Sequence, residues 1–333
     1  MPALTLHLDI NGTCTPIDNT DVALTPEQCV NMYLSKSCFG MAVCKETAGG
    51  ERTEPVWVAA PWPHLVDRAW ATEHNNKEER ESDIVSHYDF LRHTRQPKTL
   101  AHSFCAQQVP QMRHEQARDN IGSMCVRLLE FYAPGTSPLF PSVLELLRVW
   151  PQAKLIFRTF GVDAPHVVSC LRDLHQVERT FVGFKLTRSA PAEAKEEEPL
   201  FQLVGADDNR PVLQQATALQ VGDFLEALPT DAYIIDDYAY WNAHGRTAAA
   251  GKPIFPVSGT KRSTCGRILQ LGLDDNDCMY EAGPSTATCA LYQTRINPLD
   301  PLRNLHFFTI ACGTQLFRMA LGSQANEASK ANE

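Results

Sequence analysis

The stretch that most constrains the fold lies near the start of the chain, where leucine recurs at every second position from Leu4 to Leu8. This alternation is typical of a β-strand, and it ends at Asp9, just before an Asn11-Gly12 pair that favours a tight turn. The sequence therefore predicts a strand with a carboxylate at its C-terminal tip. Ligands of open α/β sheets bind beyond the carboxyl ends of strands, so Asp9 is either a nucleophile or metal ligand, or only the cap of a turn.

Two later apolar runs have the same character. Residues 154–159 end in Thr159, and residues 268–273 are followed by the pair Asp274-Asp275. Short apolar runs bounded by turn residues are typical of buried parallel strands. The sequence predicts an α/β fold, a three-layer sandwich with a mainly parallel, Rossmann-like sheet. Helical spacing predicts two amphipathic helices that would pack on this sheet, over residues 116–132 and 141–150.

The bulk composition bounds the class of protein. With 333 residues, 44% of them hydrophobic, the chain is long enough for two structural units. The net charge of −9 without a Lys/Arg run argues against a nucleic-acid or anionic-membrane partner. No apolar stretch reaches transmembrane length and no signal-peptide pattern occurs, so we expect a cytoplasmic protein. Eleven scattered cysteines without a Cys-x-x-Cys pair favour buried free thiols over a zinc site or a disulfide framework.

The polar groups at the predicted strand tips suit phosphoryl transfer. Parallel strands end at one edge of a sheet, so Asp9, Thr159 and Asp274 can converge there. A carboxylate can attack phosphorus, and paired carboxylates can hold Mg²⁺. The Thr159 hydroxyl and the Lys252 ammonium can donate to phosphoryl oxygens. We therefore expect a small phosphorylated substrate.

In this order the motifs resemble those of the haloacid dehalogenase (HAD-like) superfamily. They are Asp9-Ile10-Asn11-Gly12-Thr13, Thr159, Lys252-Pro253 and Asp274-Asp275-Asn276, and the resemblance covers roughly residues 1–13 and 116–295. It implies a HAD-like core with a smaller inserted cap domain. The expected parts are a core of residues 1–14 and 116–322, a cap over 15–115, a mobile acidic excursion at 190–211 and a disordered tail at 323–333.

The resemblance also implies roles for individual residues. Asp9 is the expected nucleophile of a Mg²⁺-dependent phosphohydrolase that forms an aspartyl phosphate. The Asn11 backbone carbonyl and Asp274 join Asp9 around Mg²⁺, and Asp275 supports the metal shell. The expected catalytic residues are Asp9, Asn11, Thr159 and Lys252, of which Thr159 and Lys252 bind phosphate. The residues expected to contact the rest of the substrate are Gly12, Thr13, Arg158, Asp236, Asp237 and Asn276.

Asn11 departs from the family pattern, because family phosphatases have a second aspartate there as general acid and base. An amide cannot shuttle a proton, and such catalysis typically contributes about 10²–10⁴-fold. One interpretation is a substrate with a good leaving group, such as an acyl phosphate. A second is that Asp236, Asp237 or His244 supplies the proton. The third is a weak or inactive catalyst that binds a phosphorylated ligand or a protein partner.

Other patterns compete with these assignments. Lys185 and Lys261 are alternatives to Lys252, although Lys252 has the more suitable place in the sequence. Asp236 and Asp237 either line a pocket or only favour a helix N-terminus. The Cys-x₅-Arg spacing from residue 289 to residue 295 is that of cysteine phosphatases, but this segment has no glycine and its pattern favours a strand.

Overall fold

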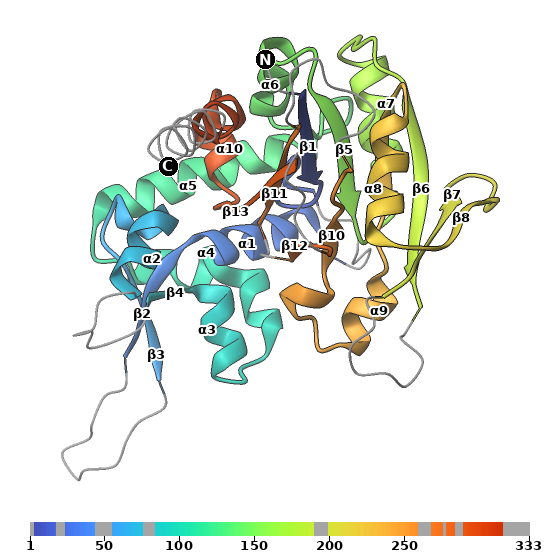
Figure 1. Ribbon diagram of the computed structural model, residues 1–333. Helices are drawn as coiled ribbons and strands as arrows, with labels where there is room; N and C mark the ends of the chain where they lie inside the picture. The colour runs from blue at the N-terminus through green and yellow to red at the C-terminus, as the bar shows by residue number, and fades with distance from the viewer. Residues whose placement is uncertain are drawn as a thin grey trace, which may run out of the picture. The chain divides into compact units, whose positions relative to one another are not determined.

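A computed structural model describes residues 3–17, 24–43, 55–75, 84–189, 199–258, 268–275, 278–283 and 289–315 (Figure 1). The chain divides into two compact units. The first comprises Met1–Thr15, Leu139–Ile296 and Asn304–Glu333. The second comprises Pro16–Pro138 and Asn297–Arg303. The second unit is thus almost entirely one insertion after the first strand of the first unit.

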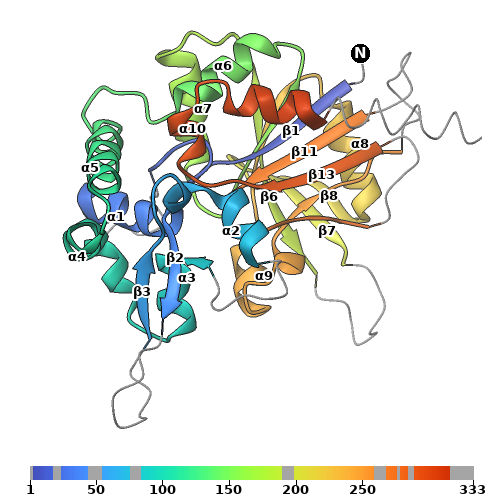
Figure 2. The same ribbon diagram turned by 90° about the vertical axis from the view of Figure 1, so that its left-hand side faces the viewer.

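Within the described residues, the first unit is built on an eight-stranded sheet of order β13-β11-β1-β5-β9-β6-β7-β8. The strands from β13 to β6 are parallel, whereas β7 and β8 continue the sheet in antiparallel pairing (Figure 2). This confirms the predicted α/β fold with a mainly parallel sheet. The strands are β1 Ala3–Asp9, β5 Lys154–Thr159, β6 Phe181–Arg188, β7 Phe201–Gly205, β8 Pro211–Ala216, β9 Asp231–Ile235, β11 Ile268–Asp274 and β13 Cys289–Arg295.

The leucine-rich strand β1 lies inside this sheet, between β11 and β5. Its residues from Leu4 to Asp9 are buried, including those between the leucines. The polar side chains among them have buried partners: Thr5 donates to Glu226 over 3.3 Å, and His7 contacts Gln270. Burial of both faces is usual for a parallel strand with elements packed on each side of the sheet.

Helices accompany the sheet in the manner of a Rossmann-like sandwich. They include α6 Pro141–Val149, α7 Ala164–Asp173 and α8 Ala218–Ala227, and residues 307–315 are also helical. Val221 and Leu225 of α8 join one apolar cluster with Phe184 of β6. Gly222 allows close packing, since a Cβ there would lie 1.8 Å from the Pro256 carbonyl oxygen. Side-chain packing of this kind fixes α8 to the sheet.

Short elements lie beyond the carboxyl ends of the parallel strands. The helix α9 Tyr238–Ala243 follows β9, and the strands β10 Lys252–Ile254 and β12 Met279–Glu281 pair in parallel. Figure 1 shows α9 past the arrowheads of β1 and β5. These elements therefore border the edge at which the predicted site lies.

The second unit combines helices with a small antiparallel sheet of order β3-β2-β4. Its first helix begins at a capping box, in which the Gln28 N–H donates to the Thr25 hydroxyl over 3.3 Å. The Thr25 N–H donates in return to the Gln28 side chain over 2.9 Å. The elements are α1 Pro26–Ser37, β2 Phe39–Val43, β3 Val56–Ala59, α2 Arg68–Asn75, β4 Ile84–Ser86, α3 His87–His93, α4 Phe104–Gln107, α5 Glu115–Glu130 and α10 Asp300–Arg303, with 3₁₀ turns at His64–Val66, Lys98–Ser103 and Val109–Gln111.

Two segments differ from the sequence-based expectation. Helix α5, expected in the core, belongs to the second unit, because its apolar face with Ile121 and Leu128 packs near α1. In the expected excursion at 190–211, Phe201–Gly205 is instead β7, since Phe201 and Leu203 are buried on one face while Gln202 is exposed. Residues 190–198 and the expected tail lie outside the described residues.

Among the helices described, none has the length and apolar character needed to cross a membrane.

His7 is a buried titratable group of β1. Burial first, and the charge of Arg158 second, lower the pKa of His7 to about 3. The Gln270 amide N–H donates to the Phe255 carbonyl, so the Gln270 Oε1 atom faces His7 and accepts from its Nε2–H over 2.7 Å. The imidazole is therefore neutral at pH 7.

We expect His7 to make the stability of the protein depend on pH. The unfolded chain takes up this proton near pH 6.5, whereas the folded protein does not until about pH 3. The contribution of neutral His7 to the free energy of unfolding is fully present above pH 6.5. It is lost as the pH falls from 6.5 toward 3, by at most about 1.4 kcal/mol per pH unit. Urea unfolding of wild type and His7→Gln from pH 7 to pH 4.5 measures it. The stability advantage of wild type should shrink with falling pH, and a constant difference would contradict the prediction.

Candidate active site

The predicted strand tips converge at one edge of the sheet, because β11, β1 and β5 are neighbours. The pairing places Asp9 of β1 beside Arg158 of β5 and aligns the ends of β1 and β11. Thr159 is the last residue of β5, and Asp274 is the last of β11. The pairing register of the buried apolar strands therefore sets the position of each of these polar groups.

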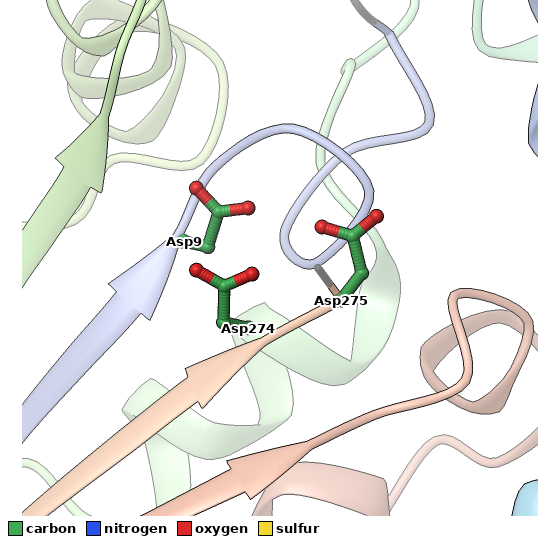
Figure 3. A group of neighbouring side chains, drawn as sticks. All are labelled: Asp9, Asp274 and Asp275. Carbon is green, nitrogen blue, oxygen red and sulfur yellow. The ribbon is translucent and has the colours of Figure 1, made fainter. Parts of the chain in front are cut away.

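The three aspartates Asp9, Asp274 and Asp275 form a buried acidic group, which we call the acidic triad. One carboxylate oxygen from each lies within 4.8 Å of the others. The side chains are nearly inaccessible, with residue exposures of 2%, 2% and 4%. Figure 3 shows Asp9 and Asp274 at the ends of their strands and Asp275 beside the loop that follows β1. Three carboxylates at this spacing could hold a divalent cation.

Lys252 of β10 reaches into the acidic triad. Its ammonium group donates to Asp9 and, over 3.1 Å, to Asp274. Burial lowers the pKa of Lys252, but the Asp274 and Asp9 carboxylates outweigh it and raise this pKa well above the ordinary value. The side chain is therefore a permanent cation between the nucleophile candidate and the end of β11.

The site carries more negative than positive charge. Burial raises the pKa of Asp9 strongly; Lys252 lowers it, and Asp274 and Asp275 raise it further. Three ionised carboxylates and one ammonium give a net charge of −3 + 1 = −2. The group should therefore take up either protons or a cation, and a divalent cation would balance the charge.

The loop after β1 packs against the triad. Gly12 has a positive φ of 83°, and a Cβ there would lie 2.5 Å from the Asp275 Oδ2 atom. Both the positive φ and the close approach to Asp275 require glycine at position 12. Among the described residues, buried Asn11 Oδ1 and Thr13 Oγ1 have no hydrogen-bond partner. Unpaired buried acceptors and donors of this kind are suited to a ligand that binds at the loop.

Asp163 contacts this loop and was not anticipated from the sequence. The Asn11 amide donates to Asp163 Oδ2 over 3.1 Å, and Asp163 is 5% exposed. Its position, four residues after the tip of β5, is the only signal that could have found it. Thr159 itself is 1% exposed, and its hydroxyl oxygen accepts from the Gly161 N–H over 2.9 Å. The Thr159 hydroxyl proton remains available to donate to a phosphoryl group.

Arg158 lies in β5 just before Thr159, and Asp236 directly follows β9. Their side chains are wholly inaccessible and form an ion pair, in which Arg158 Nε donates to Asp236 over 3.0 Å. Asp237 is occupied as well, since it caps α9 through the Tyr240 N–H and accepts from the Arg188 N–H. The charged groups of these three residues are satisfied by the protein itself, and their expected contacts with substrate stay predictions.

The remaining residues that the sequence offered as site candidates lie in several different places. Lys185 donates to Asn209 over 2.7 Å on an exposed part of β6, away from the carboxylates that Lys252 contacts. His244 stacks on Tyr240 and is exposed. Lys261 and Asn276 lie outside the described residues. The segment from residue 289 to residue 295 is the strand β13, as its pattern favoured.

Comparisons with known proteins found no match to a protein family, to a characterised protein or to a solved structure.

We expect Gly12→Ala to destabilise the protein and to disturb the triad. The substitution imposes a left-handed conformation on alanine and forces its Cβ against Asp275. Gly135→Ala is the matched control, since Gly135 has a φ of 79° but open space around it. The control should lose only the conformational part, about 1–2 kcal/mol, and Gly12→Ala clearly more. Urea unfolding compares them, and equal losses would show that the contact with Asp275 is unimportant.

Proposed function

We propose that the protein is a HAD-like phosphohydrolase that uses Mg²⁺ and acts on a small phosphorylated molecule in the cytoplasm. The observation that carries this proposal is the buried convergence of Asp9, Asp274 and Asp275 with Lys252 at the carboxyl edge of a parallel sheet. The order of the motifs along the chain supports the same assignment. The second unit would correspond to the cap domain, since it begins directly after the first motif.

The residues present fit Mg²⁺. This ion prefers oxygen ligands, and Asp9, Asp274 and the Asn11 backbone carbonyl would hold it, with Asp275 in support. The excess of carboxylates over cationic groups and the unpaired Asn11 and Thr13 oxygens are consistent with a cation and a phosphoryl group at this place. When bound, Mg²⁺ supplies charge that offsets the negative phosphoryl oxygens.

Side chains of the protein would take the following roles in the reaction. An Asp9 oxygen attacks phosphorus, and the bond from phosphorus to the leaving-group oxygen breaks with its electron pair on that oxygen. Water then attacks phosphorus, releases inorganic phosphate and regenerates the Asp9 carboxylate. Lys252 and the Thr159 hydroxyl would stabilise the phosphoryl oxygens as charge redistributes, which is where such enzymes gain most of their rate.

A second candidate function is retention of a phosphorylated ligand, or of a protein partner, without turnover. Asn11 favours this candidate because its amide lacks an acidic proton and is held by Asp163. The proposed substitutes do not compensate well, since Asp236 is paired with Arg158 inside the protein and Asp237 caps a helix. Catalysis would then depend on a leaving group that departs without protonation.

Phosphate release from a panel of phosphate esters and acyl phosphates, with and without Mg²⁺, tests the proposed function. We expect metal-dependent turnover in wild type and a loss of about 10³-fold or more in Asp9→Asn, because the nucleophile is removed. Asp119→Asn makes the same chemical change at an exposed position of α5 that is not part of the triad, and it should retain wild-type activity.

The panel also separates the two candidate functions. Turnover that is independent of Asp9 would contradict the aspartyl-phosphate mechanism. If folded wild type releases no phosphate but binds inorganic phosphate in a calorimeter, the binding function is favoured.

A further inference from the structure

We propose that the substrate is an aryl phosphate, a monoester in which the phosphoryl group is carried by a phenolic oxygen. Phe160, Tyr238 and Trp241 form what we call the aromatic shelf, and its outer members Tyr238 and Trp241 would receive the ring of the substrate. This inference rests on the proposed function and narrows it to one substrate class. Two independent observations lead to it, the position of the aromatic shelf and the amide at Asn11.

The aromatic shelf is continuous with the candidate phosphate-binding residues. Phe160 follows Thr159 directly, and the Lys252 ammonium lies 5.0 Å from the centre of the Phe160 ring. Trp241 stacks on Phe160 with ring centres 4.6 Å apart and an interplanar angle of 11°. The stacked indole fills one face of Phe160, so Lys252 must lie over the other. The shelf thus extends from the cation of the site along α9.

Tyr238 completes the shelf and is open to solvent. Its ring meets Phe160 and Trp241 edge-on, at centre distances of 6.1 and 6.0 Å. Tyr238 is 45% exposed, and no residue of α9 is buried. The aromatic side chains of α9 therefore do not anchor the helix in the apolar core. They form an accessible aromatic surface on α9, a helix that Figure 1 shows beyond the carboxyl ends of β1 and β5.

Polar contacts hold the shelf in place. The Trp241 indole N–H donates to the Thr247 carbonyl over 3.1 Å, and the Arg246 guanidinium donates to the Tyr238 hydroxyl over 2.9 Å. Arg246 also lies over Tyr238 and Trp241, at 5.8 and 5.7 Å from the ring centres. Rings and guanidinium planes both stack on planar, electron-rich groups. A flat aromatic ligand fits such a surface better than a saturated one.

The chemistry at Asn11 requires a good leaving group, and an aryl phosphate has one. Attack by Asp9 breaks the phosphorus–oxygen bond, and the electron pair departs on the leaving-group oxygen. An alkoxide needs a proton at that moment, and Asn11 has none to give. A phenolate does not, because a phenol such as that of tyrosine has a pKa of about 10, against about 16 for water. The phenolate then takes its proton from solvent, and the aspartyl phosphate is hydrolysed by water.

Turnover of phenyl phosphate and benzyl phosphate tests the leaving-group requirement. Both carry a ring, but benzyl phosphate must expel an alkoxide. We expect wild type to prefer phenyl phosphate by about 10²-fold or more in kcat/KM, the range of a missing general acid. Asn11→Asp introduces a carboxyl group and should narrow this preference. Equal turnover of the two esters by wild type would overturn the inference while leaving the proposed function intact.

Binding tests the aromatic shelf without relying on turnover. In calorimetry with the Asp9→Asn protein, phenyl phosphate should bind about tenfold more tightly than cyclohexyl phosphate, and added inorganic phosphate should compete. Trp241→Leu on this background should remove most of the difference. Trp150→Leu is the matched control, because Trp150 caps the end of α6, before β5 begins, and should leave the difference unchanged.

The outcomes of the binding test are distinct. Equal affinity for the saturated and aromatic esters, or binding that phosphate does not compete with, overturns the shelf as the leaving-group site. If phenyl phosphate is neither bound nor hydrolysed by folded protein, the inference fails, and the proposed function then depends on the rest of the phosphate panel.

Discussion

The ion pairs of Lys252 are the interaction on which the site depends. A lysine from the short strand β10 meets Asp9 of β1 and Asp274 of β11, and all three side chains are about 3% exposed. Burying one of these charges without its partner would cost several kcal/mol. The lysine therefore stabilises two carboxylates that the sheet brings together, and the carboxylates in turn fix β10 at the carboxyl edge.

A second buried ion pair supports this arrangement from within the sheet. Arg158 of β5 contacts Asp236 after β9 and also donates to the Pro253 carbonyl over 2.6 Å. Pro253 follows Lys252 directly, so the guanidinium connects β5 and β9 to the strand that carries the lysine. Arg188 adds a further link, because it donates to the Gly251 carbonyl. Charged side chains thus fasten the segment around Lys252 in addition to its buried apolar residues Ile254 and Phe255.

The sequence predicted those parts of the structure whose signal is local. Buried apolar runs that end in a polar residue identified the tips of β1, β5 and β11, since strand pairing brings such tips together. It could not show that Arg158 turns inward, because a strand residue and its distant partner Asp236 leave no joint pattern. The apolar face of α5 likewise indicated that this helix is packed, but periodicity does not say against which unit. The role of Asp163 was not predicted for the same reason, because its contact with Asn11 joins two loops that are distant in the sequence.

The position of β1 has a consequence for how the chain acquires its structure. Ala3 pairs with Ile268 and Leu8 with Leu273, so 265 residues separate the paired positions. During synthesis, the leucine-rich segment emerges long before either neighbouring strand is complete. Contacts of such wide sequence separation form late and slowly, and the unpaired apolar strand remains open to wrong association meanwhile. The segment with the clearest pattern in the sequence is therefore also the one most in need of protection in the nascent chain.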